Sequence, residues 1–119
     1  MNKRGLAKIA VGVGTLALVA VSGCASKYVQ AAVRNQTSGA VTLVEVDYPS
    51  ASFGSETLAA GAEYDYHFKI LGSGPTKVLW TDADRKQHEV AGPNLDEGQQ
   101  GALIVTLTQS GATWDVRLK

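Results

Sequence analysis

The heptapeptide YDYHFKI, residues 64–70, alternates large apolar side chains with polar ones. Its polar positions are Asp65, His67 and Lys69, and its other four positions are two tyrosines, a phenylalanine and an isoleucine. Successive side chains of a β-strand point to opposite faces of the sheet, so a period of two predicts a strand with one buried face. We therefore expect His67 to face solvent.

The same alternation recurs in LIVTLT, residues 103–108, and in TWDVRLK, residues 113–119. Polar breaks at 35–39, 82–86 and 109–112 separate apolar runs and are interpreted as hairpin turns. The strands that this pattern predicts are 28–34, 41–48, 56–59, 62–70, 75–81, 86–91, 102–109 and 112–118. Between them, YPSASFG divides the middle of the chain, and GPNLDEGQQG, residues 92–101, is expected to be the longest polar loop.

Seven to eight short strands with frequent turns are typical of an all-β, antiparallel β-sandwich. A single sheet would leave Trp80 and Trp114 exposed, so a second sheet must cover them. A small barrel is the alternative. The stretch LAAGAEYDYHF, residues 58–68, resembles the immunoglobulin-like or fibronectin-like modules of bacterial envelope proteins. The resemblance implies a sandwich fold and carries no function, and the cysteine pair of true immunoglobulin domains is absent from the sequence.

The first 23 residues differ in composition from the rest of the chain. They contain Lys3, Arg4 and Lys8 and no acidic residue, followed by 13 uncharged residues at 9–21. A membrane-spanning helix needs about 20 apolar residues, so this shorter run is typical of a signal-peptide core.

The motif Val21-Ser22-Gly23-Cys24 ends this segment and contains the one cysteine of the sequence. It resembles the lipobox of bacterial lipoproteins, with Val21 in place of the usual leucine. The resemblance implies that residues 1–23 are removed and that Cys24 becomes a lipidated N-terminus, with a diacylglyceryl thioether and an acyl chain such as palmitate on the new amine. Residues 24–27 are then a short tether, and 28–119 form the sandwich domain. Ala25, in place of aspartate, favours the outer membrane of a bacterium that has two.

Charge limits the partners of the mature chain. From Cys24 onward there are eight basic and eleven acidic residues, a net charge of −3. This domain would not be attracted to an anionic leaflet, so the lipid anchor would have to hold it at the membrane. The absence of a basic stripe from the sequence disfavours nucleic acid as a partner. The oligomeric state is left open.

The sequence has no family motif for nucleotide binding, phosphate binding or a catalytic nucleophile. We therefore predict no enzyme activity, catalytic residue, cofactor or metal. The alternative is a periplasmic metal-binding protein or small hydrolase, in which His67, His88 and a carboxylate meet in one pocket, or Asp65 and His67 belong to a catalytic triad. Scattered histidines and a filled interior would favour the first interpretation.

What remains is an interaction surface. The predicted function is a lipid-anchored cell-envelope protein, a non-catalytic module that binds or scaffolds an envelope component close to the membrane. Strand addition at a sheet edge is a further possibility for its partner. Tyr48 and Phe53 are either part of this surface or packed in the core. The residues predicted for the interaction loop are Asn94, Asp96, Glu97 and Gln99.

Overall fold

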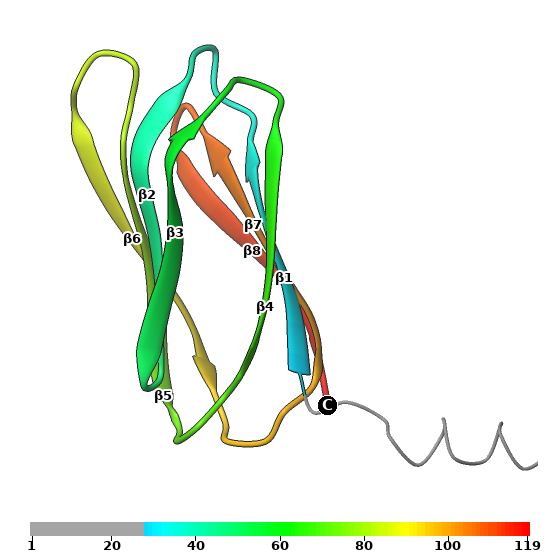
Figure 1. The fold of residues 1–119 in the computed structure, drawn as a ribbon. Helices are drawn as coiled ribbons and strands as arrows, with labels where there is room; N and C mark the ends of the chain where they lie inside the picture. The colour runs from blue at the N-terminus through cyan, green and yellow to red at the C-terminus, as the bar shows by residue number, and fades with distance from the viewer. Residues whose placement is uncertain (1–27) are drawn as a thin grey trace, which may run out of the picture.

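The computed structural model describes residues 28–119, which form two four-stranded β-sheets packed face to face (Figure 1). The strands in chain order are β1 (Tyr28–Asn35), β2 (Val41–Tyr48), β3 (Ala51–Leu58), β4 (Glu63–Lys69), β5 (Gly74–Thr81), β6 (Gln87–Leu95), β7 (Gly101–Thr108) and β8 (Gly111–Leu118). The predicted all-β sandwich is confirmed, and the alternative of a small barrel is wrong, because the two sheets are separate. No helix in this part of the chain is long and apolar enough to cross a membrane.

Sheet A has the strand order β4-β1-β7-β8, and sheet B has the order β3-β2-β5-β6. All neighbours are antiparallel except β1 and β7, which run parallel. The predicted antiparallel sandwich is confirmed, and this one parallel pair is a feature that the sequence pattern does not indicate. The first strand lies inside its sheet and pairs with strands from the middle and the end of the chain, a long-range arrangement that local alternation does not encode.

Three predicted boundaries differ from the structure. Residues 35–39 are not a hairpin turn, because β1 and β2 belong to different sheets and the segment crosses between them. β3 begins at Ala51, although its serines, alanine and glycine have low strand propensity, because pairing with β2 extends along its length. β6 continues to Leu95, so the expected loop 92–101 is reduced to 96–100.

The core lies between the sheets. Its fully buried side chains are mainly valine and leucine, with Trp80 only 2% exposed. Trp114 reaches the core from β8 and packs against Gly92, where a Cβ atom would lie 2.5 Å from its ring. Tyr48 and Phe53 belong to the core and its edge, since the Tyr48 ring stacks on Phe68 at 3.9 Å and Phe53 is buried.

Alternation predicts burial well for inner strands and less well for edge strands. Leu103, Val105 and Leu107 of β7 are all buried, as the pattern indicates. On the edge strands, Tyr66 of β4 is 40% exposed and Val116 of β8 is 43% exposed, although both were expected to be covered. An edge strand has a neighbour on one side only, so the opposite sheet covers less of it.

The two ends of the sandwich are named here by their distance from Tyr28, the first residue that the structure describes. The proximal end contains Tyr28, the loops 70–73 and 96–100, and Lys119, whose backbone pairs with that of Gln100. The distal end contains the loops 36–40, 59–62, 82–86 and 109–110 (Figure 1). Any attachment that precedes residue 28 therefore joins the domain at the proximal end.

Candidate functional site

A small hollow lies at the distal end, between the loop 36–40 and the turn that joins β5 to β6. The loop 36–40 forms its first wall and is held in place by Asn35, the last residue of β1. Its side chain is fully buried, and its amide nitrogen donates hydrogen bonds of 2.9 Å to the carbonyl oxygens of Gly39 and Leu58. Its side-chain oxygen accepts from the backbone N–H and the hydroxyl of Thr37, at 2.9 and 2.6 Å. All four hydrogen-bonding positions of this amide are used, so Asn35 fixes the course of the 36–40 loop.

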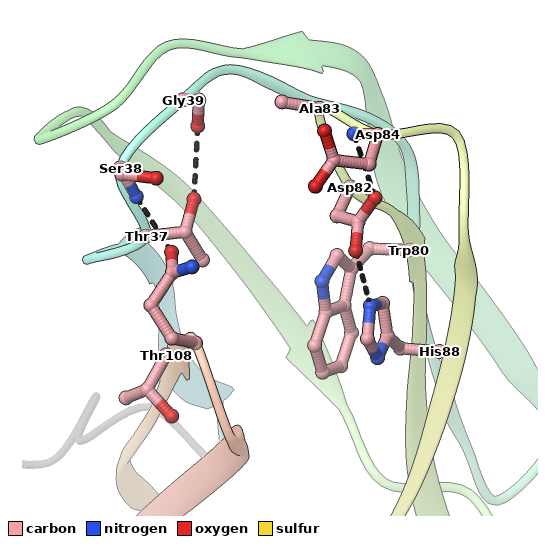
Figure 2. Close-up of a pocket in the computed structure, with 10 residues that line it drawn as sticks. Thr37, Ser38, Gly39, Trp80, Asp82, Ala83, Asp84, His88 and Thr108 are labelled. Carbon is pink, nitrogen blue, oxygen red and sulfur yellow. Dashed lines mark hydrogen bonds and ion pairs between the residues drawn. The ribbon is translucent and has the colours of Figure 1, made fainter.

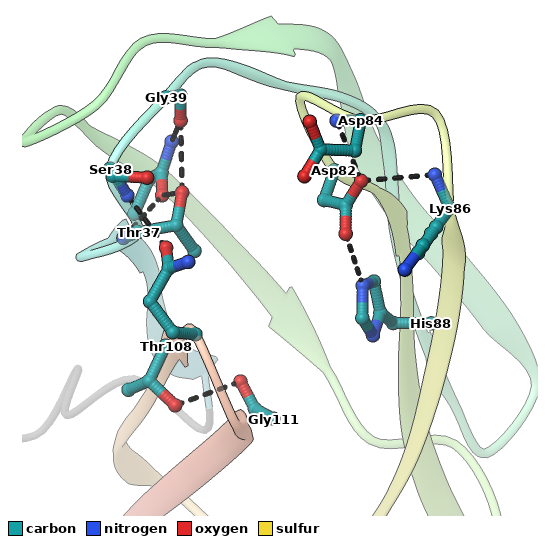
Figure 3. A network of polar contacts seen from close by, with 11 residues as sticks. Thr37, Ser38, Gly39, Asp82, Asp84, Lys86, His88, Thr108 and Gly111 are labelled. Atoms are coloured by element: carbon teal, nitrogen blue, oxygen red, sulfur yellow. Dashed lines mark hydrogen bonds and ion pairs between the residues drawn. The ribbon is translucent and has the colours of Figure 1, made fainter.

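Asp82 organises the second wall, which is the hairpin turn between β5 and β6. One carboxylate oxygen accepts the backbone N–H groups of Asp84 and Lys86 at 2.8 and 2.9 Å (Figure 3). Arg85 lies in the left-handed region at φ 67°, as a tight turn permits. The predicted hairpin turn at 82–86 is confirmed, since β5 and β6 pair directly across it.

The same turn brings a histidine onto the buried tryptophan. Pairing across the hairpin places Trp80 opposite His88, and their rings stack with centroids 4.8 Å apart and planes 13° apart (Figure 2). Nε2 of His88 lies 2.7 Å from the second carboxylate oxygen of Asp82. Asp82 therefore both closes the turn and orients the imidazole.

The hollow between these walls has a volume of about 40 Å³, enough for one or two water molecules. Gln109, from the third loop, accepts the backbone N–H of Ser38 at 2.7 Å and so ties the β7–β8 turn to the first wall. Ser38 and His88 lie on opposite sides of the hollow (Figure 2). Among residues 28–119 no hydroxyl is hydrogen-bonded to His88, so the pair of base and carboxylate has no nucleophile in place.

The electrostatics of the hollow favour the ionised carboxylate. The hydrogen bond from His88 is the largest cause that holds the pKa of Asp82 below its usual value, and the backbone N–H of Lys86 adds to it. A lowered pKa means that the folded state binds this proton less tightly than the unfolded state. The stabilisation is therefore present above the unfolded pKa of about 3.9 and is lost as pH falls through the lower folded value.

We expect Asp82→Asn to be less stable than the wild type at neutral pH, and we expect the difference to shrink toward zero as pH falls from about 6 to about 2. The measurement is the urea midpoint across that range, followed by circular dichroism. His88→Gln is the matched control. It removes the main cause of the lowered pKa of Asp82, so the stability of this variant should depend less on pH over the same range than that of the wild type. A difference between wild type and Asp82→Asn that does not change with pH would contradict this assignment.

The two histidines do not meet. His67 lies on β4 in sheet A, exposed as predicted and in edge-to-face contact with the Tyr28 ring at 5.0 Å, whereas His88 lies on β6 in sheet B. Within residues 28–119 no three His, Cys, Asp or Glu side chains are grouped as metal ligands would be. The metal-binding alternative required both histidines to meet a carboxylate in one pocket, and the structure places the two histidines in different sheets.

The predicted interaction residues lie at the proximal end. Asn94 is in β6, while Asp96, Glu97 and Gln99 form the loop that follows. This loop is held to its neighbour, since Glu97 N–H donates to the hydroxyl of Ser73 at 3.0 Å. The interaction role of these residues stays a prediction. The lipobox residues Val21, Ser22, Gly23 and Cys24 lie outside the described residues.

Sequence reasoning missed the cluster of Trp80, Asp82 and His88. Asp82 was interpreted as a turn residue and His88 as a strand residue, and each is correct taken alone. A usable signal was present, because a hairpin closed over 82–86 requires position 80 to pair with position 88.

No protein-family model matches the chain, and no curated protein matches it. Among solved structures, the chain is similar to a protein from Eubacterium rectale determined by NMR. That match has a TM-score of 0.56 and 13% sequence identity and covers 76% of this chain and 89% of the other. A Bacteroides uniformis protein with a provisional assignment to cell adhesion gives a TM-score of 0.46 and 8% identity, covering 78% of this chain and 50% of the other. The similarity to the Eubacterium protein concerns the fold alone.

Proposed function

We propose that this protein is a lipid-anchored cell-envelope module that binds or scaffolds another envelope component and catalyses no reaction. The observation that carries the proposal is the position of residue 28, because β1 begins at the proximal end of the sandwich. An anchor at Cys24 leaves only residues 24–27 as a tether, which span at most about 14 Å when extended. The proximal end then lies against the bilayer, and the distal end faces away from it.

Two further observations favour binding over the metal-binding or hydrolytic alternative. The histidines lie on different sheets, and the interior between the sheets is filled by apolar side chains. The distal loops are also held rigidly, by Asn35 on one side and Asp82 on the other. A rigid loop cluster loses little conformational entropy when a partner binds, which is the property of a preformed recognition surface.

The anchor is tested by expressing the full chain in a bacterium with radiolabelled palmitate. We expect the wild type to incorporate label and to fractionate with membranes, and we expect Cys24→Ala to lose both. Ser26→Ala is the matched control, since it alters the same segment without removing the thiol. A wild-type protein that carries no label would overturn the anchored function.

The binding role is tested separately by cross-linking the anchored protein in intact cells and identifying the products by mass spectrometry. A reproducible envelope protein, recovered with the wild type and lost when Cys24→Ala releases the domain from the membrane, is the expected result. Recovery of no reproducible partner would count against a scaffold.

A further inference from the structure

The outer face of sheet B presents a leucine in an unusual conformation. Leu43 of β2 is 65% exposed, and its φ of 51° lies in the left-handed region. The register between β2 and β5 shifts between Thr42 and Glu45, so β2 has one residue more than β5 at this point. Leu43 lies on the outer face with Glu45, in alternation with the buried Val44 and Val46, and the bulge falls where this alternation breaks between Leu43 and the buried Val41.

The neighbouring strand is adapted to the bulge. A Cβ atom on Gly54 of β3 would collide with the carbonyl oxygen of Val44, so only glycine lets β3 lie this close. Glycine or asparagine would also adopt the conformation of residue 43 more easily than leucine does. The chain therefore has an exposed apolar side chain at a position that backbone energetics disfavour, and such strain is characteristic of functional sites.

Two open depressions lie on either side of Leu43. One has a volume of about 400 Å³ and is bordered on its far side by Leu79 and Glu89. The other has a volume of about 280 Å³ and is bordered by Gly54 and Glu56. Leu43 and Glu45 line both, so the leucine forms a ridge between two hollows that can each receive a side chain.

The charge of this face is strongly negative. Its charged side chains are four carboxylates and one amine, namely Glu45, Asp47, Glu56, Glu89 and Lys77. The outer face of sheet A is balanced instead, with three of each sign, namely Glu63, Asp65, Asp115, Arg34, Lys69 and Arg117. The negative charge of the domain is therefore concentrated around Leu43.

The single amine does not neutralise these carboxylates. Lys77 lies 3.9 Å from both Asp47 and Glu89, so one charge is shared between two partners. A hydrogen bond with Asp47 and repulsion by its charge raise the pKa of Glu45, as expected where carboxylates are crowded. Several of these negative charges therefore lack a cation of their own within the domain, and a partner could supply it.

The negative charge of this face limits which kinds of partner can bind there. A second copy of this chain docked through the same face would set acidic groups against acidic groups, and an anionic lipid surface or a nucleic acid would also be repelled. A cationic protein segment is attracted, and lysine or arginine side chains can reach the carboxylates around the ridge.

We propose that the outer face of sheet B, centred on Leu43, binds an extended segment of a protein partner whose sheet-facing positions, every second residue, include both apolar side chains and lysine or arginine. The apolar side chains enter the two depressions on either side of Leu43, and the cationic ones pair with Glu45, Glu56 and Glu89. The larger depression adjoins the distal hollow, since Trp80 and His88 line both. The proposal rests on the proposed binding function and adds the chemical character of the partner. It does not depend on the lipid anchor.

The test uses the full chain, purified in a non-ionic detergent, and a fluorescent eight-residue peptide in which leucine and lysine occupy every second position in turn, with serine between them, so that both face the sheet. Fluorescence polarisation should show saturable binding that weakens as salt is raised, whereas a glutamate–leucine peptide of equal length should not bind. Leu43→Gly should weaken the affinity by about tenfold or more, the factor that corresponds to burial of one leucine side chain. The double variant Glu45→Gln with Glu89→Gln should weaken it about threefold to tenfold and flatten the salt dependence.

Leu71→Gly is the matched control, because Leu71 is 62% exposed but lies at the proximal end. It should change the affinity by less than about twofold. Since glycine suits the left-handed conformation, Leu43→Gly should unfold at no lower urea concentration than the wild type, which separates lost binding from lost folding. No binding of the lysine–leucine peptide, equal binding of the acidic peptide, or equal effects of Leu43→Gly and Leu71→Gly would each overturn the proposal. Failure of palmitate labelling would leave this result intact.

Discussion

Asn35→Asp is expected to lower the free energy of unfolding by about 3–5 kcal/mol, although the two side chains have nearly the same shape. The native amide nitrogen donates to the carbonyl oxygens of Gly39 and Leu58, and a carboxylate cannot donate to either. An ionised carboxylate would also lie fully buried beside those two oxygens. Ionisation is therefore opposed there, so the variant should recover part of its stability when acid protonates the introduced group.

The measurement for Asn35→Asp is urea unfolding followed by circular dichroism, at neutral pH and again near pH 4. Asn94→Asp is the matched control, because Asn94 is exposed on β6, and we expect a change within about 0.5 kcal/mol. Equal stabilities for the two variants would show that the Asn35 hydrogen bonds contribute little to the crossing between the sheets.

Trp80→Ala should destabilise the domain by about 3–5 kcal/mol, because it removes the largest fully buried side chain and leaves a cavity between the sheets. The indole also supports the stacked ring of His88, which in turn contacts Asp82. We therefore expect the variant to lose some of the acid-dependent stability assigned to the Asp82–His88 pair as well. A domain of this size is stable by only about 5–15 kcal/mol, so the variant lies near the limit of folding.

Trp80→Phe provides the comparison for this position. It retains an aromatic surface for His88 and should lose roughly half as much stability as Trp80→Ala. Both variants are measured by circular dichroism in urea, since fluorescence would lose one of its two reporters. If Trp80→Ala and Trp80→Phe were equally stable, packing of the indole against the opposite sheet would not be the source of its contribution.

Period-two alternation was sufficient to predict the sandwich, since the run 103–108 shows at once which side chains are buried. It was not sufficient to predict which strands are neighbours. Nothing local in residues 28–35 indicates that β1 lies between β4 and β7, or that it runs parallel to β7. Strand order depends on contacts between residues far apart in the chain, and a single sequence records each strand without its partner.

The distal hollow and the outer face of sheet B were predicted less well than the fold. The physical reason differs between the two. Asp82 was recognised through its turn preference, but its bond to His88 depends on the register of a hairpin. Leu43 belongs to an apolar run in which both Val41 and Val44 are buried, and the bulge opposite β5 breaks the alternation that would otherwise show which face Leu43 shares. A bulge of one residue reverses every later side-chain direction, so small errors of register become large errors of surface.

The central position of β1 has a mechanical consequence. A tension applied between an anchor that precedes residue 28 and a partner held at the distal end would act along the length of this strand. The load would be a shear shared by the hydrogen-bond ladders to β4 and β7, which must give way together, whereas an edge hairpin can be peeled open one bond at a time. The strand nearest the tether is thus also one that is held by a neighbouring strand on each side.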